Sequence, residues 1–224
     1  MTLLFLCNNE DNMENMTFSQ ASKFLLECKK ELDRWFEIDL PMPELIVLQS
    51  AEDVVAIWDR EPGESPPIGW ADIERHKLYI LSPAEALKFN IKAYNLKSLI
   101  KHEYAHLYWH AIVGSGQPVW MDEGLACYLA KEPFKLRSKN LILKIQDYFD
   151  RKTFDTYAVG YFSVKYLLEK FGRKKFLAFL KKLSKLPSKI TRKIDKKEFE
   201  QLFQKHFHLS LSRRAIKQIL KDIP

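Results

Sequence analysis

The sequence predicts an α+β fold in which a small mixed sheet is followed by a mainly helical carboxy-terminal half. Short apolar runs bounded by prolines and polar turns occur between residues 44 and 81. Apolar residues at helical spacing precede this stretch and dominate the chain after residue 96. A chain of 224 residues that is 46% hydrophobic can bury a substantial core. We therefore expect a folded protein rather than a disordered chain.

The first 81 residues are expected to contain one helix, three short strands and a second, short helix that begins after Ser50 and runs to Trp58. Residues 19–36 place apolar side chains on one helical face and charged side chains on the other. A short apolar run at 45–48 is typical of a strand. Runs at 68–72 and 77–81, separated by a short polar segment, indicate a β-hairpin that Ser82-Pro83 closes.

The carboxy-terminal half is expected to be helical. A long helix is predicted from 96 to 112, a loop containing two glycines ends it, and a second helix is predicted from 121 to 131. The later helical segments are predicted at 138–149, 157–171, 174–184, 196–206 and 212–220. No linker is long enough to separate independent domains, so we expect one domain of residues 1–224 with approximate subdomains 1–112 and 113–224.

The cysteines and the apolar segments bear on the compartment. Cys7, Cys28 and Cys127 are widely separated and odd in number, so they indicate neither a disulfide framework nor a thiolate zinc cluster. The apolar run at residues 1–7 is too short for a signal peptide, and no window approaches a membrane-spanning length. These features predict a cytoplasmic protein with no membrane span.

The net charge of +7 is unevenly distributed along the chain. From residue 170 onward there are 17 Lys and Arg against 4 Asp and Glu, a net charge of +13, which leaves −6 for residues 1–169. These lysines alternate with apolar residues at helical spacing, which favours solvated helix faces over a nucleic-acid-binding surface. Nucleic acid, anionic lipid or an acidic protein remains the less favoured partner of this region.

The segment from His102 to His106 fits the pattern H-E-x-x-H and lies within the predicted long helix. Residues four apart lie on one helix face, so the two imidazoles can bind one Zn²⁺ at about 2.0–2.1 Å. Glu103 would then lie beside the water that the metal activates, in the position of a general base. The alternative is that both histidines are merely packed in the helix.

A catalytic zinc site also needs a third protein ligand and an open position. Glu123 lies on the next predicted helix within the sequence Glu-Gly-x-Ala, and the short glycine loop lets the two helices pack antiparallel. We therefore expect one Zn²⁺ per chain, bound by His102, His106 and Glu123. The alternative for Glu123 is an exposed acid near a helix start, where the helix dipole favours negative charge.

Three blocks of the sequence resemble the gluzincins, which are metallopeptidases of the thermolysin and aminopeptidase type, and especially the compact minigluzincins. The blocks are Leu99–His106, Trp120–Tyr128 and Tyr157–Gly172, and the resemblance spans about residues 68–183. It implies a zincin-like fold, in which the active-site helix packs against a mainly helical carboxy-terminal subdomain. It also implies a single peptidase domain.

The resemblance assigns further roles near the metal. The hairpin before the active-site helix would contribute an edge strand to which an extended peptide adds, with Trp70 and Ala71 as substrate-binding residues. Tyr157 is similar to a tyrosine that donates a hydrogen bond to the developing oxyanion. The alternative for Trp70, Tyr157 and the neighbouring Tyr161 is an ordinary place in the core.

One position departs from the family pattern. Thermolysin-like enzymes have an Asp four residues after the glutamate ligand, and it orients the first histidine; this chain has Cys127 there. Another acceptor, with Asp122 as one choice, should take the second N–H of that histidine. Cys127 as a fourth ligand would close the site and make it structural, and this is disfavoured because its side chain would have to curve back towards the metal.

These patterns together predict a zinc metallopeptidase acting on a peptide or protein substrate, with Glu103 as general base. The alternative is a latent or non-catalytic gluzincin-fold protein that binds an acidic partner or nucleic acid through its basic carboxy-terminal helices. In a latent enzyme, a terminal segment would cover the site. The substrate, the choice between endopeptidase and aminopeptidase action, and the oligomeric state do not follow from the sequence.

Overall fold

The computed structural model describes residues 18–48, 50, 52–53, 67–88, 95–132, 134–135, 138–150 and 152–219. The chain divides into two compact units, Met1–Leu107 and Tyr108–Pro224, and the division falls within one long helix. Both helices and a small three-stranded sheet are present, so the expected mixed α+β class is confirmed. The single domain with a subdivision after residue 112 stays a prediction.

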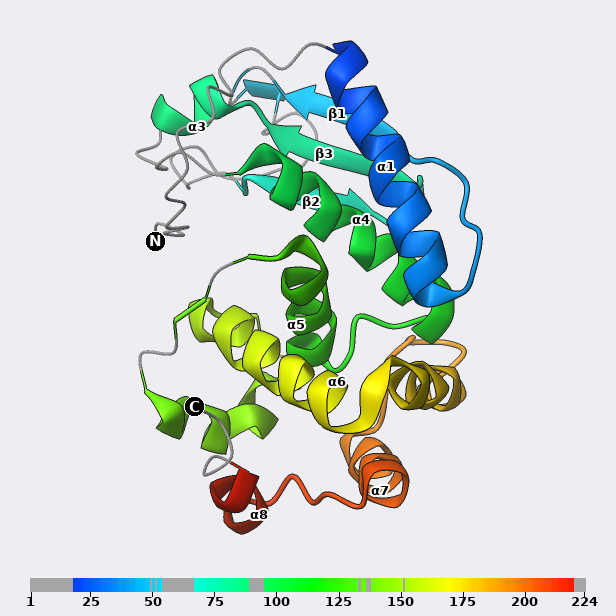
Figure 1. The fold of residues 1–224 in the computed structure, drawn as a ribbon, viewed down its shortest axis with the longest axis vertical. Helices are drawn as coiled ribbons and strands as arrows, with labels where there is room; N and C mark the ends of the chain where they lie inside the picture. The colour runs from blue at the N-terminus through cyan, green and yellow to red at the C-terminus, as the bar shows by residue number, and fades with distance from the viewer. Residues whose placement is uncertain are drawn as a thin grey trace. The chain divides into compact units, whose positions relative to one another are not determined.

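The first unit contains a mixed sheet of strand order β1-β3-β2 (Figure 1). Strand β1 (Glu44–Leu48) pairs in parallel with β3 (Lys77–Leu81), and β2 (Gly69–Asp72) pairs with β3 in antiparallel fashion. The central strand β3 is buried from its second residue onward, whereas β2 is half-buried. The predicted hairpin is therefore confirmed, and β2 lies at an edge of the described sheet.

Helix α1 (Phe18–Phe36) buries Leu25, Cys28, Leu32 and Phe36, which recur at intervals of three and four residues. The charged face opposite supplies an ion pair from Glu31 to Lys101 of helix α4 (Leu96–Val113), as expected for neighbouring helices. Both helices begin and end within one residue of their predicted bounds.

Helix α3 (Pro83–Lys88) was not expected, because Ser82-Pro83 was interpreted as the end of the hairpin. The Ser82 hydroxyl accepts a hydrogen bond from the Glu85 backbone N–H at 3.2 Å, which makes Ser82 the N-cap, and Pro83 occupies the first helical position. The segment predicted after Ser50 also begins with a reciprocal pair of bonds between Ser50 and Asp53, and its residues 54–58 lie outside the described residues.

The second unit is helical and centres on the packing of α5 (Val119–Ala130) against α6 (Phe154–Leu183). The two backbones meet at a pair of glycines. A Cβ at Gly124 would lie 2.2 Å from the Gly160 carbonyl carbon, and a Cβ at Gly160 would lie 2.1 Å from the Trp120 carbonyl oxygen. No side chain fits at either position, so glycine in the Glu-Gly-x-Ala segment is a packing requirement.

Two predicted helical segments take a different form. The segment predicted at 138–149 is the 3₁₀ helix η1 (Lys139–Tyr148), whose residue Lys144 has non-helical dihedral angles. The segments predicted at 157–171 and 174–184 both belong to α6, and Gly172 between them kinks it with φ 76° and ψ 158°. Only glycine adopts such a backbone without strain, so the expected interruption at this residue is confirmed.

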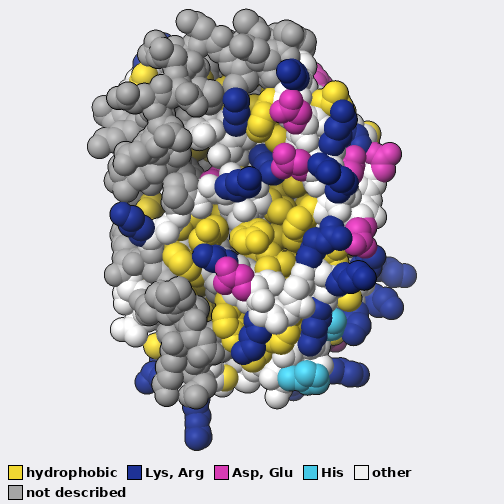
Figure 2. Space-filling model, in the orientation of Figure 1, with side chains coloured by type: hydrophobic (Ala, Val, Ile, Leu, Met, Phe, Trp, Pro, Cys, Tyr) yellow, Lys and Arg dark blue, Asp and Glu magenta, His cyan; other side chains and the backbone are white. Residues whose placement is uncertain are grey.

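The basic carboxy-terminal region folds over an aromatic core. Helix α7 (Lys196–Phe207) buries Phe199, Phe203 and Phe207, and Phe179 of α6 packs against all three with ring centroids 4.9–6.1 Å apart. The lysines of α7 are exposed, and Figure 2 shows Lys and Arg side chains gathered at the lower right, where Figure 1 draws this helix. The basic side chains of α7 are therefore exposed, and the choice between a solvated face and a partner-binding face stays a prediction. The chain continues into α8 (Arg213–Ile219).

Two observations bear on the expected compartment. Cys28 and Cys127 are buried free thiols, and Cys7 lies outside the described residues. Within the described part of the chain, no helix is long and apolar enough to cross a membrane.

Candidate metal centre

Helix α4 carries both motif histidines on one face, as their spacing of four residues predicts. The His102 and His106 rings lie with centroids 4.9 Å apart and their planes at 73°. Both residues are buried, with 4% and 8% of their surface exposed. Buried imidazoles in this arrangement need polar partners, which a shared metal ion can supply.

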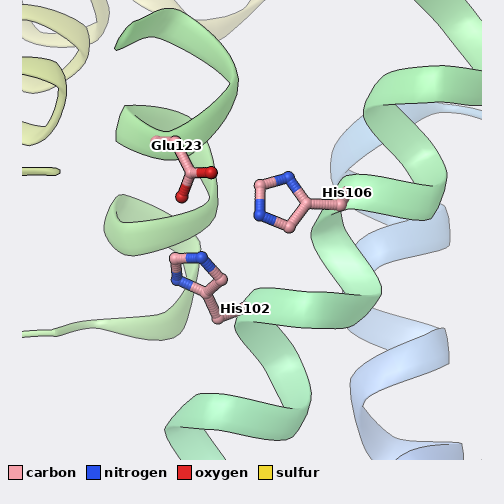
Figure 3. A group of neighbouring side chains, drawn as sticks. All are labelled: His102, His106 and Glu123. Atoms are coloured by element: carbon pink, nitrogen blue, oxygen red, sulfur yellow. The ribbon is translucent and has the colours of Figure 1, made fainter. Parts of the chain in front are cut away.

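Glu123 is the third member of this group. It lies on α5, is 5% exposed, and offers a carboxylate oxygen within 4.8 Å of a ring nitrogen of each histidine (Figure 3). Figure 3 shows the two rings and the carboxylate turned towards one another. Adjacent ligand atoms around a tetrahedral zinc ion are roughly 3.3 Å apart, so small side-chain rotations bring the three into reach of one ion. The group could therefore hold a metal ion.

A second buried group shares His102. Cys127 and Glu132 each place a ligand atom within 4.8 Å of this histidine and of one another. Glu132 follows the end of α5, where Lys131 adopts a left-handed conformation and the Glu132 N–H donates to the Cys127 carbonyl at 3.1 Å. Its carboxylate suits the second N–H of His102, a partner that metal-bound histidines nearly always have.

Sequence reasoning missed Glu132, because its burial cannot be read from a single sequence. A carboxylate just after a helix end is disfavoured by the helix dipole, so a buried one there needs a donor or a cation nearby. Asp122, the acceptor considered from the sequence, has its Oδ2 3.9 Å from Nε2 of His110. Its role beside the metal ligands stays a prediction, and His110 lies partly buried beside it.

Glu103 lies close to the edge strand. It is buried, and a Cβ built on Gly69 would lie 3.1 Å from its Oε1 atom, from Leu99 Cδ1 and from Ile80 Cδ1. Gly69 is the first residue of β2, so the absence of a side chain there leaves room for the Glu103 carboxylate. The proposed base and the proposed substrate strand therefore meet within the first unit.

The two residues singled out for substrate binding follow on the same strand. Trp70 and Ala71 of β2 are half-buried, and the Trp70 ring stacks on Tyr79 of β3 with centroids 4.5 Å apart and planes at 8°. One face of the Trp70 indole is therefore covered by the Tyr79 ring of the neighbouring strand. The substrate-binding role of both residues stays a prediction.

Tyr157 lies half-buried in the first turn of α6, and its role as a hydrogen-bond donor also stays a prediction. The structure adds a neighbour that sequence reasoning missed. The Lys152 ammonium lies 5.4 Å from the Tyr157 ring centroid and 2.7 Å from Oε1 of Glu123. The sequence around Lys152 does not predict its contact with Glu123, because that contact depends on how α5 and α6 pack against each other.

No model of a known protein family matches the chain, and no curated protein matches it in sequence.

Proposed function

We propose that this chain is a zinc-dependent metallopeptidase of the gluzincin type with a zincin-like fold. The observation that carries the proposal is the buried group of His102, His106 and Glu123, with Glu103 next to the first histidine on the same helix. Two imidazoles and one carboxylate are the ligands of the two-histidine, one-glutamate class of catalytic zinc sites.

The donor set favours zinc over the other common ions. Calcium and magnesium bind six or more oxygen atoms, and this group offers two nitrogens and a single carboxylate. A structural zinc site would be closed by four protein ligands, most often cysteines. With three protein ligands, one coordination position remains for water or substrate, so we expect one Zn²⁺ per chain.

The bound zinc would polarise the scissile carbonyl and lower the pKa of a water molecule towards about 7. Glu103 would take a proton from that water and return it to the leaving amine, acting first as general base and then as general acid. Burial of Glu103 beside β2 keeps its carboxylate in one place, which is what proton transfer requires.

The edge position of β2 supports a mode of substrate binding. An extended peptide can add to the edge strand of a sheet by main-chain hydrogen bonds, and Trp70 and Ala71 lie on β2, an edge strand among the described residues. A peptide seated there would pass close to Gly69 and hence to Glu103. The Tyr157 hydroxyl would donate to the oxyanion that forms at the scissile carbonyl.

The alternative function is a latent or non-catalytic protein that binds an acidic partner or nucleic acid through its basic helices. It is favoured by the exposed Lys and Arg side chains of α6, α7 and α8. A purely structural use of the metal, however, gives no reason for an acid at position 103 beside the first histidine.

The deciding experiment measures zinc content and peptide cleavage together. Purified protein should contain one zinc per chain and cleave members of an unbiased peptide library. Glu103→Gln should keep the zinc and lose the cleavage, because it removes the base without touching a ligand. Cleavage that survives in Glu103→Gln would reject the proposed mechanism. Zinc without any cleavage would favour the alternative, and protein that binds no zinc would reject the site.

A further inference from the structure

The side chain of Lys152 contacts the metal group, the name used here for His102, His106 and Glu123. The Lys152 ammonium forms an ion pair with the Glu123 carboxylate at 2.7 Å. The two side chains differ sharply in exposure, since that of Glu123 is 6% exposed and that of Lys152 is 56% exposed. A solvent-accessible lysine therefore reaches inward to a buried carboxylate that also belongs to the metal group.

A buried carboxylate needs a positive partner. Removal of an ionised carboxylate from water is costly unless a cation or several hydrogen-bond donors replace the water. In the metal-loaded protein, the ion would supply that positive charge at Glu123. In the metal-free chain, the ammonium of Lys152 supplies it.

Lys152 is also placed so that it can leave. It precedes α6, whose first helical residue is Phe154, and most of its flexible side chain faces solvent. The Tyr157 ring, 5.4 Å from the ammonium, offers a second contact of the cation–π kind. Glu123, by contrast, is fixed on α5 by the close contact between Gly124 and Gly160.

We propose that Lys152 takes the place of the metal at Glu123, so that its ammonium neutralises the buried carboxylate in the metal-free chain and is displaced when the metal binds. The inference rests on the proposed metal site and adds a residue to it. It makes metal binding an exchange of one cation for another at the Glu123 carboxylate.

Two effects of Lys152 on metal affinity have opposite signs. As a hydrogen-bond donor, it would orient Glu123 and strengthen binding. As a cation, it competes with the metal for the same carboxylate and repels the incoming ion. Because packing of α5 already orients Glu123, competition should dominate. An ion pair with one exposed partner has a modest strength, so the expected change in affinity is about twofold to tenfold.

The test is zinc affinity of the full-length chain, measured by competition with a chromophoric chelator after metal removal. Lys152→Met should bind zinc about twofold to tenfold more tightly than the wild-type chain. Lys152→Arg keeps the charge and should stay close to wild type. Lys165→Met is the matched control, because Lys165 pairs with Glu169 on the surface of α6 and should leave zinc affinity unchanged.

A second readout needs no metal. Lys152→Met should lower the thermal midpoint of the metal-free protein and increase the rise in midpoint that zinc produces. In a Glu123→Gln background, the same change should have little effect on the metal-free midpoint, because the charge that Lys152 neutralises is gone.

The outcomes separate the two proposals. Wild-type protein with one zinc per chain and equal or weaker zinc binding in Lys152→Met would overturn the role of Lys152 alone. Wild-type protein that takes up no zinc would overturn the metal site and this inference together. Tighter zinc binding in Lys152→Met, with Lys152→Arg and Lys165→Met unchanged, would support the displacement.

Discussion

Replacing Gly69 with alanine tests whether Glu103 and the edge strand work as one unit. The new Cβ would lie 3.1 Å from Glu103 Oε1 and equally close to the terminal methyl groups of Leu99 and Ile80. Each distance is a few tenths of an ångström shorter than an ordinary contact. The two methyl groups can move aside by rotation of their side chains with no effect on the proposed chemistry. The Glu103 carboxylate must also shift by a few tenths of an ångström, and this shift is the one that should affect catalysis.

The expected loss is in the rate of the chemical step. A displacement of about 1 Å in a catalytic group can cost on the order of a hundredfold, so a few tenths should lower kcat by about threefold to tenfold. Stability should change by less than about 1 kcal/mol, because replacing Gly with Ala reduces the entropy of the unfolded chain and offsets part of the crowding.

Steady-state kinetics on a peptide substrate and denaturant unfolding measure the two quantities. Gly114→Ala is the control, because Gly114 has φ 73° and no atom within 4 Å of its added Cβ. That variant should lose about 1 kcal/mol of stability through backbone strain and keep its kcat. An unchanged kcat in Gly69→Ala would refute the contact between strand and base, and an equal fall in both variants would attribute the loss to stability.

Three further predictions concern packing, chemistry and pH. Gly124→Ala should destabilise the protein by about 3 kcal/mol, because its Cβ would lie 2.2 Å from the Gly160 carbonyl carbon. Denaturant unfolding measures this loss, and a value below about 1 kcal/mol would contradict the close packing of α5 on α6. Tyr157→Phe should lower kcat by about a hundredfold with little change in KM, and a change confined to KM would exclude a role at the oxyanion. Burial, and then the neighbouring Lys182 and Lys175, lower the pKa of His206 below its ordinary 6.5 despite the hydrogen bond from its ring to the Lys175 carbonyl. The folded protein therefore favours the neutral ring of His206. This contribution to the free energy of unfolding is present above pH 6.5 and is lost as the pH falls below that value. The thermal midpoint of His206→Gln should therefore depend less on pH between 7 and 5 than that of the wild-type protein.

The helices of this protein are predictable because their signals are local. The pattern of α1 and the stretch around the motif in α4 repeat at helical spacing, and the structure places their ends within one residue of expectation. The shared face of His102 and His106 follows from the same period. Helix α3 shows the limit of this reasoning, since Ser-Pro both closes a hairpin and caps a helix.

The contacts that complete the candidate site are not local. Glu123 could be named from the sequence because it lies on the next predicted helix after a short glycine loop, and because the segment around it resembles a known motif. Lys152 reaches Glu123 only through the packing of α5 on α6, which depends on two glycines 36 residues apart in the chain. A single sequence displays neither that contact nor the buried position of Glu132.

His102 belongs to both buried groups, and this bears on the role of Cys127. His106 and Glu123 share the first group with it, whereas Cys127 and Glu132 share the second. An imidazole has two ring nitrogens, and if one binds the metal, the other is left as a donor. A carboxylate accepts such a hydrogen bond far better than a thiol does, so Glu132 is the better partner for that nitrogen. If a metal binds here, Glu132 would then take the part that an Asp at position 127 plays in the gluzincins that the sequence resembles, and the proposed site would not need Cys127 as a ligand.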